Sequence, residues 1–95
     1  MAAPLAEEFK KANCTIVAEW FNRTGYHLRI AAPKETMALL GYGNERAWKT
    51  MIADNEPEDD GLMYVAIREG SDGGEVRMTT GKQARQHARQ HGFRG

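Results

Sequence analysis

The chain has 95 residues, with 13 Lys plus Arg against 13 Asp plus Glu, so its formal net charge is zero. This is the usual length of one domain, which argues against a second independent core or a multi-site enzyme. A hydrophobic content of 41% and a charged content of 27% are near globular averages and argue against full disorder. No apolar run approaches the roughly 18 residues of a membrane span, and the N-terminal residues lack the apolar centre of a signal peptide. We therefore expect a cytoplasmic protein that contacts no membrane.

The zero net charge is the sum of unevenly charged segments. Residues 1–53 contain seven basic and five acidic side chains, and residues 54–60 contain five acidic side chains and no basic one. Residues 61–80 contain two basic and three acidic side chains, and residues 81–95 contain four basic ones. Segregated charge is typical of solvated faces or of interaction tails. The zero net charge therefore does not exclude a nucleic-acid partner, although a protein without net positive charge has weak non-specific affinity for nucleic acid.

Apolar residues in the first segment recur every three or four positions, which predicts an amphipathic helix over residues 5–22. The stripe consists of Leu5, Phe9, Ala12, Ile16 and Trp20. Gly25 is placed to end this helix. A strand over residues 14–21 is the alternative, because Thr, Ile and Val are β-branched. We favour the helix because its stripe is longer.

The middle of the chain predicts a short strand and two helices. Residues 26–30 alternate between apolar and polar side chains and form the strand. Residues 33–40 predict a short helix, with proline in its first turn and Gly41 just beyond its end. After a turn over residues 41–43, Asn44 caps a second helix. These two helices span residues 33–54, and an acidic loop follows over residues 54–60.

The last third of the chain predicts a β-hairpin and a basic helix. Two strand-like runs over residues 62–79 flank the strong turn signal Ser71-Asp72-Gly73-Gly74. A C-terminal helix over residues 81–92 follows and is closed by Gly92. We expect all these elements to form a single α+β domain over residues 1–95.

Residues 35–51 resemble the helix-turn-helix of the MerR and phage-excisionase type of DNA-binding protein. In that pattern an acidic residue opens the first helix, two leucines precede a glycine, an apolar residue fills the turn, and a polar residue starts the second helix. The matching residues are Glu35, Leu39, Leu40, Gly41, Tyr42 and Asn44. Gly41 would let the chain leave the first helix in a left-handed conformation.

The resemblance implies a winged-helix-like domain with the order helix, short strand, helix-turn-helix, β-hairpin and C-terminal helix. It implies a small regulator of transcription or an architectural factor that binds double-stranded DNA, of the kind that phages and mobile elements encode. The second helix of the motif would enter the major groove. The residues expected to contact DNA are Lys34, Thr36, Asn44, Arg46 and Lys49 in the motif, Arg68 and Arg77 in the hairpin, and Lys82, Arg85 and Arg89 in the last helix. An exposed, solvated face is the alternative for Arg46 and Lys49.

A protein-interaction module, such as a phage-type inhibitor of a host complex, is the second hypothesis. The acidic residues 54–60 would then contact a basic partner surface or repel DNA. In this interpretation residues 14–21 pair with residues 26–30 as a hairpin, which gives a ββαββα order. The partner would be a host protein or a second copy of the chain.

Candidate catalytic and metal-binding residues are few, and we expect neither an enzyme nor a cofactor. The carboxylates cluster in a loop expected to be solvated, where no burial would raise a pKa for acid catalysis. Cys14 is the single cysteine, which fits a reducing compartment, and it lies beside a predicted buried stripe where thiols are normally inert. His87 and His91 have the i, i+4 spacing of a metal pair, but their helix supplies no third ligand. His27, on the predicted strand, is expected to be structural.

Overall fold

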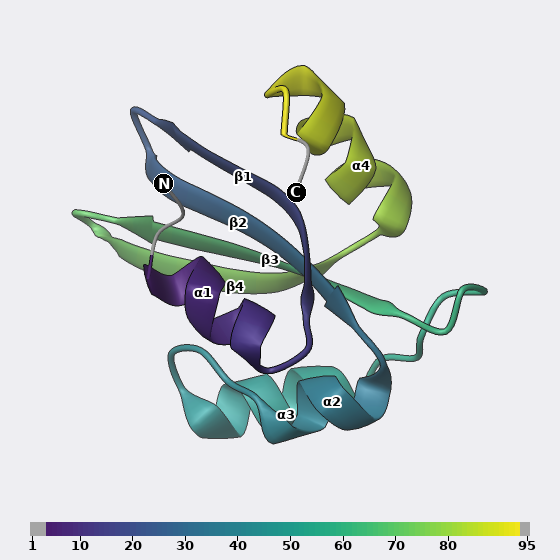
Figure 1. Cartoon of the computed structure of the whole chain (residues 1–95). Coiled ribbons are helices and arrows are strands. Elements are labelled where there is room, and N and C mark those ends of the chain that lie inside the picture. The colour runs from purple at the N-terminus through teal and green to yellow at the C-terminus, as the bar shows by residue number, and fades with distance from the viewer. Residues whose placement is uncertain (1–3, 94–95) are drawn as a thin grey trace.

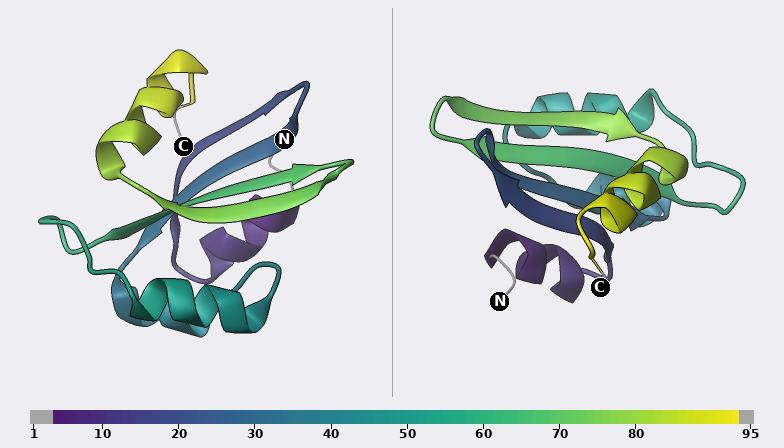
Figure 2. Two further views of the ribbon diagram at one scale, coloured as in Figure 1. Left: turned by 180° about the vertical axis from the view of Figure 1, so that it is seen from behind. Right: turned by 90° about the horizontal axis from the view of Figure 1, so that it is seen from above.

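The computed structural model describes residues 4–93, which fold around one antiparallel sheet with the strand order β1-β2-β3-β4 (Figure 1). The strands are β1 (Thr15–Asn22), β2 (Gly25–Ala32), β3 (Met63–Gly70) and β4 (Gly73–Thr79). The helices are α1 (Pro4–Lys11), α2 (Lys34–Leu39), α3 (Glu45–Ala53) and α4 (Gly81–Gln90). Helices α1, α2 and α3 lie on one face of the sheet and α4 lies on the other (Figure 2). The expected α+β class is confirmed.

The single helix predicted over residues 5–22 is wrong. Helix α1 ends at Lys11, and Asn13 adopts a positive φ of 70° that stops the helical path. The Asn13 amide donates to the Lys10 carbonyl at 3.1 Å, and the Cys14 amide donates to the Phe9 carbonyl at 3.0 Å. This pair of bonds is the Schellman pattern that closes a helix, and Asn is one of the few residues that tolerates the left-handed conformation. The chain therefore leaves α1 in time to form β1.

Strand β1 contains a β-bulge that conceals its period of two residues. Ile16 pairs with Ile30, but the next paired residue is Ala18 with Arg29, so Val17 is the extra residue. A bulge moves all following side chains to the opposite face. Trp20 consequently lies on the same face as Ala18, away from Ile16. The β1–β2 hairpin of the alternative interpretation is thereby confirmed.

The β1–β2 and β3–β4 hairpins form one four-stranded sheet. This order of elements differs from the expected winged-helix domain, in which a long helix and a single short strand precede the helix-turn-helix. The β-hairpin predicted over residues 62–79 is confirmed as β3 and β4, which join at Gly70 and Gly73. The remaining elements, β2, α2, α3 and α4, begin and end close to their predicted positions. The expected left-handed exit at Gly41 is wrong, because Leu40 is extended and the positive φ of 74° occurs at Gly43.

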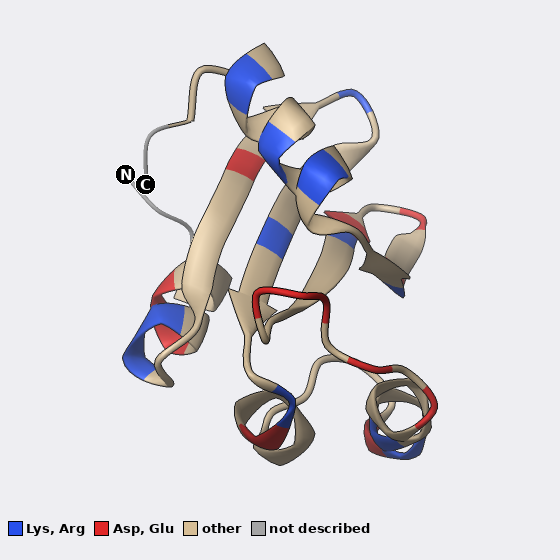
Figure 3. Cartoon of the chain, turned by 90° about the vertical axis from the view of Figure 1, so that its right-hand side faces the viewer, with Lys and Arg blue, Asp and Glu red and all other residues tan. Residues whose placement is uncertain are grey.

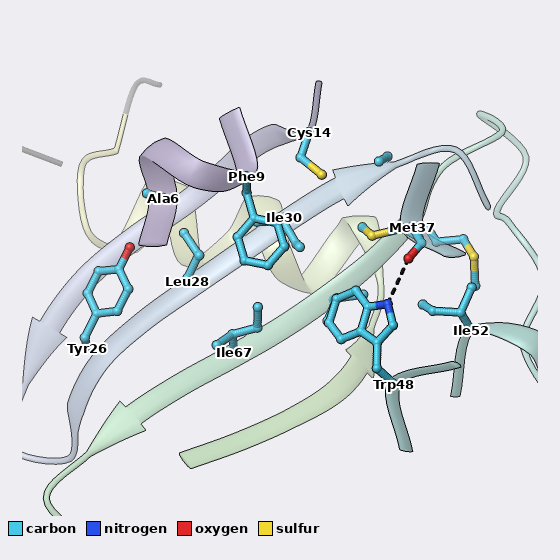
Figure 4. Close-up of a cluster of buried hydrophobic side chains, with 13 residues drawn as sticks. Ala6, Phe9, Cys14, Tyr26, Leu28, Ile30, Met37, Trp48, Ile52 and Ile67 are labelled. Atoms are coloured by element: carbon cyan, nitrogen blue, oxygen red, sulfur yellow. Dashed lines mark hydrogen bonds between the residues drawn. The ribbon is translucent and has the colours of Figure 1, made fainter. Parts of the chain in front are cut away.

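The main core lies between the sheet and helices α1, α2 and α3 (Figure 4). Alternate strand residues supply it, with Leu28 and Ile30 from β2 and Val65 and Ile67 from β3. Trp48 of α3 is buried, and its indole N–H donates to the Met37 carbonyl at 2.8 Å. That bond satisfies a polar group that would otherwise be costly to bury.

Candidate nucleic-acid interface

The strand residues that point away from the main core form what we call the α4 face. Cross-strand partners have side chains on the same side of a sheet. One row of partners across the sheet is Trp20, His27, Arg68 and Glu75, and the next row is Ala18, Arg29, Ala66 and Arg77. Basic and aromatic side chains therefore gather on the α4 face, and α4 covers part of it.

Trp20 is the centre of a cluster that also contains His27, Arg29, His87 and His91, here called the Trp20 cluster. The three imidazole rings stack on the indole with centroid distances of 4.8 Å for His27, 4.7 Å for His87 and 4.3 Å for His91. The Arg29 guanidinium lies 4.8 Å from the centre of the indole ring. Stacking of His87 and His91 on the indole holds the C-terminal part of α4 against β1, whereas His27 and the cation–π contact of Arg29 join β2 to the cluster.

The histidines of the Trp20 cluster do not converge on a metal site. His87 and His91 share one face of α4, as their spacing predicted, but that face is packed on the indole. Within residues 4–93, no group of three or more His, Cys, Asp or Glu side chains is arranged to hold a metal ion. Burial, followed by the nearby Arg29, lowers the pKa of His27 and His87.

Arg29 is a buried cation with few partners. Its side chain is 5% exposed, and one guanidinium nitrogen, Nη1, donates to the Leu28 carbonyl at 3.2 Å. Within residues 4–93, the Nε atom has no hydrogen-bond partner and no carboxylate forms an ion pair with Arg29. Burial, and secondarily the charge of Arg77, lowers the pKa of Arg29. A buried charge without a counter-ion is costly, so this arrangement needs a reason.

Arg68 differs from Arg29 because it is fully engaged within the fold. Its guanidinium contacts Glu75 at 2.9 Å and Asp72 at 3.1 Å, and Nη1 also donates to the Thr24 carbonyl at 2.9 Å. These carboxylates raise the pKa of Arg68. Arg68 therefore ties the β1–β2 turn to the β3–β4 turn. Of the two arginines predicted to act in a hairpin wing, only Arg77 has no such ion pair within residues 4–93.

The outer surface of α4 carries the other predicted basic residues. At about 100° per residue, Lys82, Arg85 and Arg89 lie on one stripe opposite the inward-facing Ala84 and His87. All three are exposed, and α4 contains no acidic residue. Figure 3 shows the basic positions along this helix. The stripe on α4 is thus positive, and the acidic side chains nearby belong to the loop at its first turn.

The acidic loop packs close to the first turn of α4. The Glu58 carboxylate accepts a hydrogen bond from the Gly81 amide at 3.0 Å, where the helix dipole favours negative charge. Asp60 accepts from the Tyr64 hydroxyl, and that hydroxyl in turn accepts from Arg85 at 3.2 Å. The loop expected to be a solvated run therefore has a structural role. Arg85 of the α4 stripe also lines a cavity together with Glu58, Asp59 and Asp60.

The predicted helix-turn-helix residues lie on the opposite side of the sheet. Lys34 binds the end of α3 through the Asn55 carbonyl at 2.7 Å and the Glu56 carboxylate at 3.1 Å. Asn44 caps α3 by accepting from the Ala47 amide at 2.9 Å. Lys49 pairs with Glu45 at 3.0 Å. Arg46 is exposed and Thr36 is half-buried. The ten predicted contact residues are thus divided between two surfaces.

Sequence reasoning missed Arg29 and Trp20 as members of a site. The signal for Arg29 is its place on the outward side of a recognised strand, two residues from His27, because residues at i and i+2 share a face. Trp20 had no readable signal, because the bulge at Val17 decides which face it occupies. Cys14 is buried as predicted, and burial raises its pKa to about 11, so the thiol stays protonated at neutral pH.

Comparisons of the chain with protein-family models, curated proteins and solved structures gave no match. None of the helices within residues 4–93 has the length and apolar character needed to cross a membrane. The function of the protein is therefore inferred from the arrangement of its own side chains.

Proposed function

We propose that this protein binds double-stranded DNA, as a small regulator or architectural factor, through the exposed stripe of α4. The observation that carries the proposal is the alignment of Lys82, Arg85 and Arg89 on a helix surface without acidic residues. DNA presents closely spaced phosphates, and basic side chains gain affinity by displacing their counter-ions. A helix that projects such a stripe from the fold is suited to this contact.

Fewer observations support the α2–α3 surface as the main contact with DNA. Its cations Lys34 and Lys49 are already paired with Glu56 and Glu45, and the Asn44 side-chain oxygen is used as a helix cap. Glu35 and Glu45 also lie in the first turns of these helices. Negative charge there opposes the approach of phosphates. The proposal therefore assigns the principal contact to α4 instead of α3.

The dimensions and side chains of α4 suit the major groove. A helix of 10 residues is about 15 Å long, and the groove is about 12 Å wide. Gln83, Gln86 and Gln90 border the basic stripe. Arginine pairs with guanine and glutamine with adenine, each with about 1–3 kcal/mol of discrimination. The same helix thus carries groups for phosphates and for base edges.

The proposal is tested by measuring the affinity for a fluorescently labelled duplex of about 20 base pairs. Fluorescence anisotropy at 50 and 200 mM salt gives this affinity. The α4 double variant Lys82→Gln/Arg89→Gln removes two charges that have no side-chain partner within residues 4–93. The α3 double variant Arg46→Gln/Lys49→Gln removes the same charge and is the matched control. We expect the α4 variant to lose about tenfold or more in affinity and to show a shallower salt dependence.

The control variant should bind within about threefold of the unmodified chain, because its charges would lie away from the DNA. Equal losses in the two variants would indicate diffuse attraction and contradict the assignment to α4. Absence of duplex binding at 50 mM salt would contradict DNA binding altogether.

A cavity between α3 and β4 favours a second candidate, a protein-interaction module. It has a volume of about 390 Å³ and is lined largely by Tyr42, Trp48, Met51 and Val76. Aromatic and methionine side chains are enriched where proteins bind one another. A nuclease-insensitive pull-down that recovers one stoichiometric partner, and loses it with Met51→Glu, would favour this function over DNA binding.

A further inference from the structure

A second cavity, of about 100 Å³, opens on the α4 face beside the Trp20 cluster. Its lining includes His27, Arg29, Arg68, Glu75 and Arg77. We propose that this cavity is a binding site for a phosphate group, held chiefly by Arg29 and Arg77. The site is separate from the exposed stripe of α4.

The buried guanidinium of Arg29 is the first reason to expect an anion. Arg29 is buried, and among the described residues 4–93 its Nε has no hydrogen-bond partner and no carboxylate forms an ion pair with it. An oxyanion supplies both the negative charge and the hydrogen-bond acceptors that this position lacks.

The position of Arg77 is the second reason. Arg29 of β2 and Arg77 of β4 lie in one row of the sheet, and the residue between them on β3 is Ala66, whose side chain is a single methyl group. The small side chain leaves room for the cavity. Two cations without a shared carboxylate repel each other, and an anion between them removes that repulsion.

The size and chemistry of the cavity favour a phosphate group. A volume of about 100 Å³ holds a few water molecules at about 30 Å³ each, so it suits a small oxyanion. The planar fork of arginine matches the spacing of phosphate oxygens. Glu75 also lines the cavity, but Arg68 holds its carboxylate at 2.9 Å. The phosphate group can belong to a free phosphomonoester or, if the DNA proposal above holds, to the DNA backbone.

Backbone amide NMR signals of residues 27–29, 66–68 and 75–77 provide the test. The full chain is titrated with inorganic phosphate at constant ionic strength and, separately, with a short DNA duplex. Three variants are compared with it: Arg29→Met, Arg77→Gln and the control Arg46→Gln, which lies on α3 across the sheet. Arg29→Met removes a buried unpaired charge, so its fold is expected to persist. Arg77 is exposed, so Arg77→Gln keeps the test valid in any case.

We expect inorganic phosphate to shift these signals to saturation, with affinity reduced about tenfold or more in Arg29→Met and Arg77→Gln and unchanged in Arg46→Gln. Shifts at these positions with the duplex alone, lost in the same two variants, would support the site with the DNA backbone as the source. Absence of shifts with both probes, or the same shifts in all variants, would overturn the proposal. The phosphate titration does not involve DNA, so the DNA proposal can fail without affecting this result.

Discussion

Gly25 decides how closely the β1–β2 turn approaches β3. Its φ of +118° is a conformation that residues with a side chain rarely adopt. A Cβ atom at this position would lie 2.1 Å from the Glu69 carbonyl oxygen on β3. Both the backbone conformation and the packing therefore require glycine. Arg68, which donates to the Thr24 carbonyl, fastens the same turn.

We predict that Gly25→Ala destabilises the protein by more than about 2 kcal/mol, because the strained φ and the clash with backbone act together. Gly43→Ala is the matched control. Gly43 also has a positive φ, of 74°, but apart from its two chain neighbours no residue of the described range 4–93 has an atom within 4 Å of its added Cβ. It should cost only about 1–2 kcal/mol. Urea denaturation of both variants measures the difference, and equal losses would contradict the role of the Glu69 contact.

At the scale of elements, α4 is held at its first turn and along its inner face. The Thr80 hydroxyl accepts from the Gln83 amide at 3.1 Å, and Glu58 accepts from the Gly81 amide. At the other end, Gly92 has a φ of 67°, and the Phe93 amide donates to the Ala88 carbonyl at 2.9 Å. The N-terminal and C-terminal bonds satisfy backbone groups that a helix leaves unpaired.

We predict that Thr80→Ala lowers the free energy of unfolding by about 1 kcal/mol, because the Gln83 amide loses its acceptor. Thr80→Ser retains a hydroxyl and should remain within about 0.5 kcal/mol of the unmodified chain. Thermal and urea unfolding of the two variants give the comparison. A loss of the same size in Thr80→Ser would show that the threonine methyl group, and not the cap, matters.

The elements also show where local sequence patterns are reliable. The β3–β4 hairpin was predicted because alternation and the Gly-rich turn act over a few residues. Strand β1 was predicted only as the alternative to a helix, because its bulge places Ile16, Val17 and Ala18 in an order without a period of two. The spacing of Phe9, Ile16 and Trp20 then imitates a helix. Only pairing with β2 separates the two possibilities.

At the scale of the whole molecule, the three histidines of the chain lie together at the α4 face. His27 from β2 and His87 from α4 both have a lowered pKa, chiefly through burial. The groups around them are the cations Arg29, Arg68 and Arg77 and the imidazole of His91. Adding protons to this face brings more positive charge close to cations, of which only Arg68 forms an ion pair within residues 4–93.

We predict that the protein loses stability as the pH falls below about 6.5, the ordinary pKa of histidine. In that range the unfolded chain binds protons to His27 and His87 more readily than the folded chain, so the proton uptake favours unfolding. Urea unfolding between pH 8 and pH 5 measures the effect. The variant His87→Gln should show a flatter dependence.

Carboxylates act in a separate range of pH. Hydrogen bonds lower the pKa of Asp60 and Asp72, so their stabilisation is present above the ordinary carboxylate pKa and is lost in stronger acid.

If the free energy of unfolding of His87→Gln depends on pH between 6.5 and 5 as strongly as that of the unmodified chain, the role of His87 is contradicted.

The sequence by itself determined most of the elements, the cap of α3 at Asn44 and the placement of three cations on α4. These features depend on neighbours within a few residues, through caps, turns and periodicity. Tertiary structure alone decided that residues 15–22 form a strand, that Trp20 faces α4 and that Arg29 is buried beside Arg77. The register between strands determines these outcomes, because a bulge of one residue exchanges the two faces of the sheet. That register is fixed by contacts between segments that lie far apart in the chain.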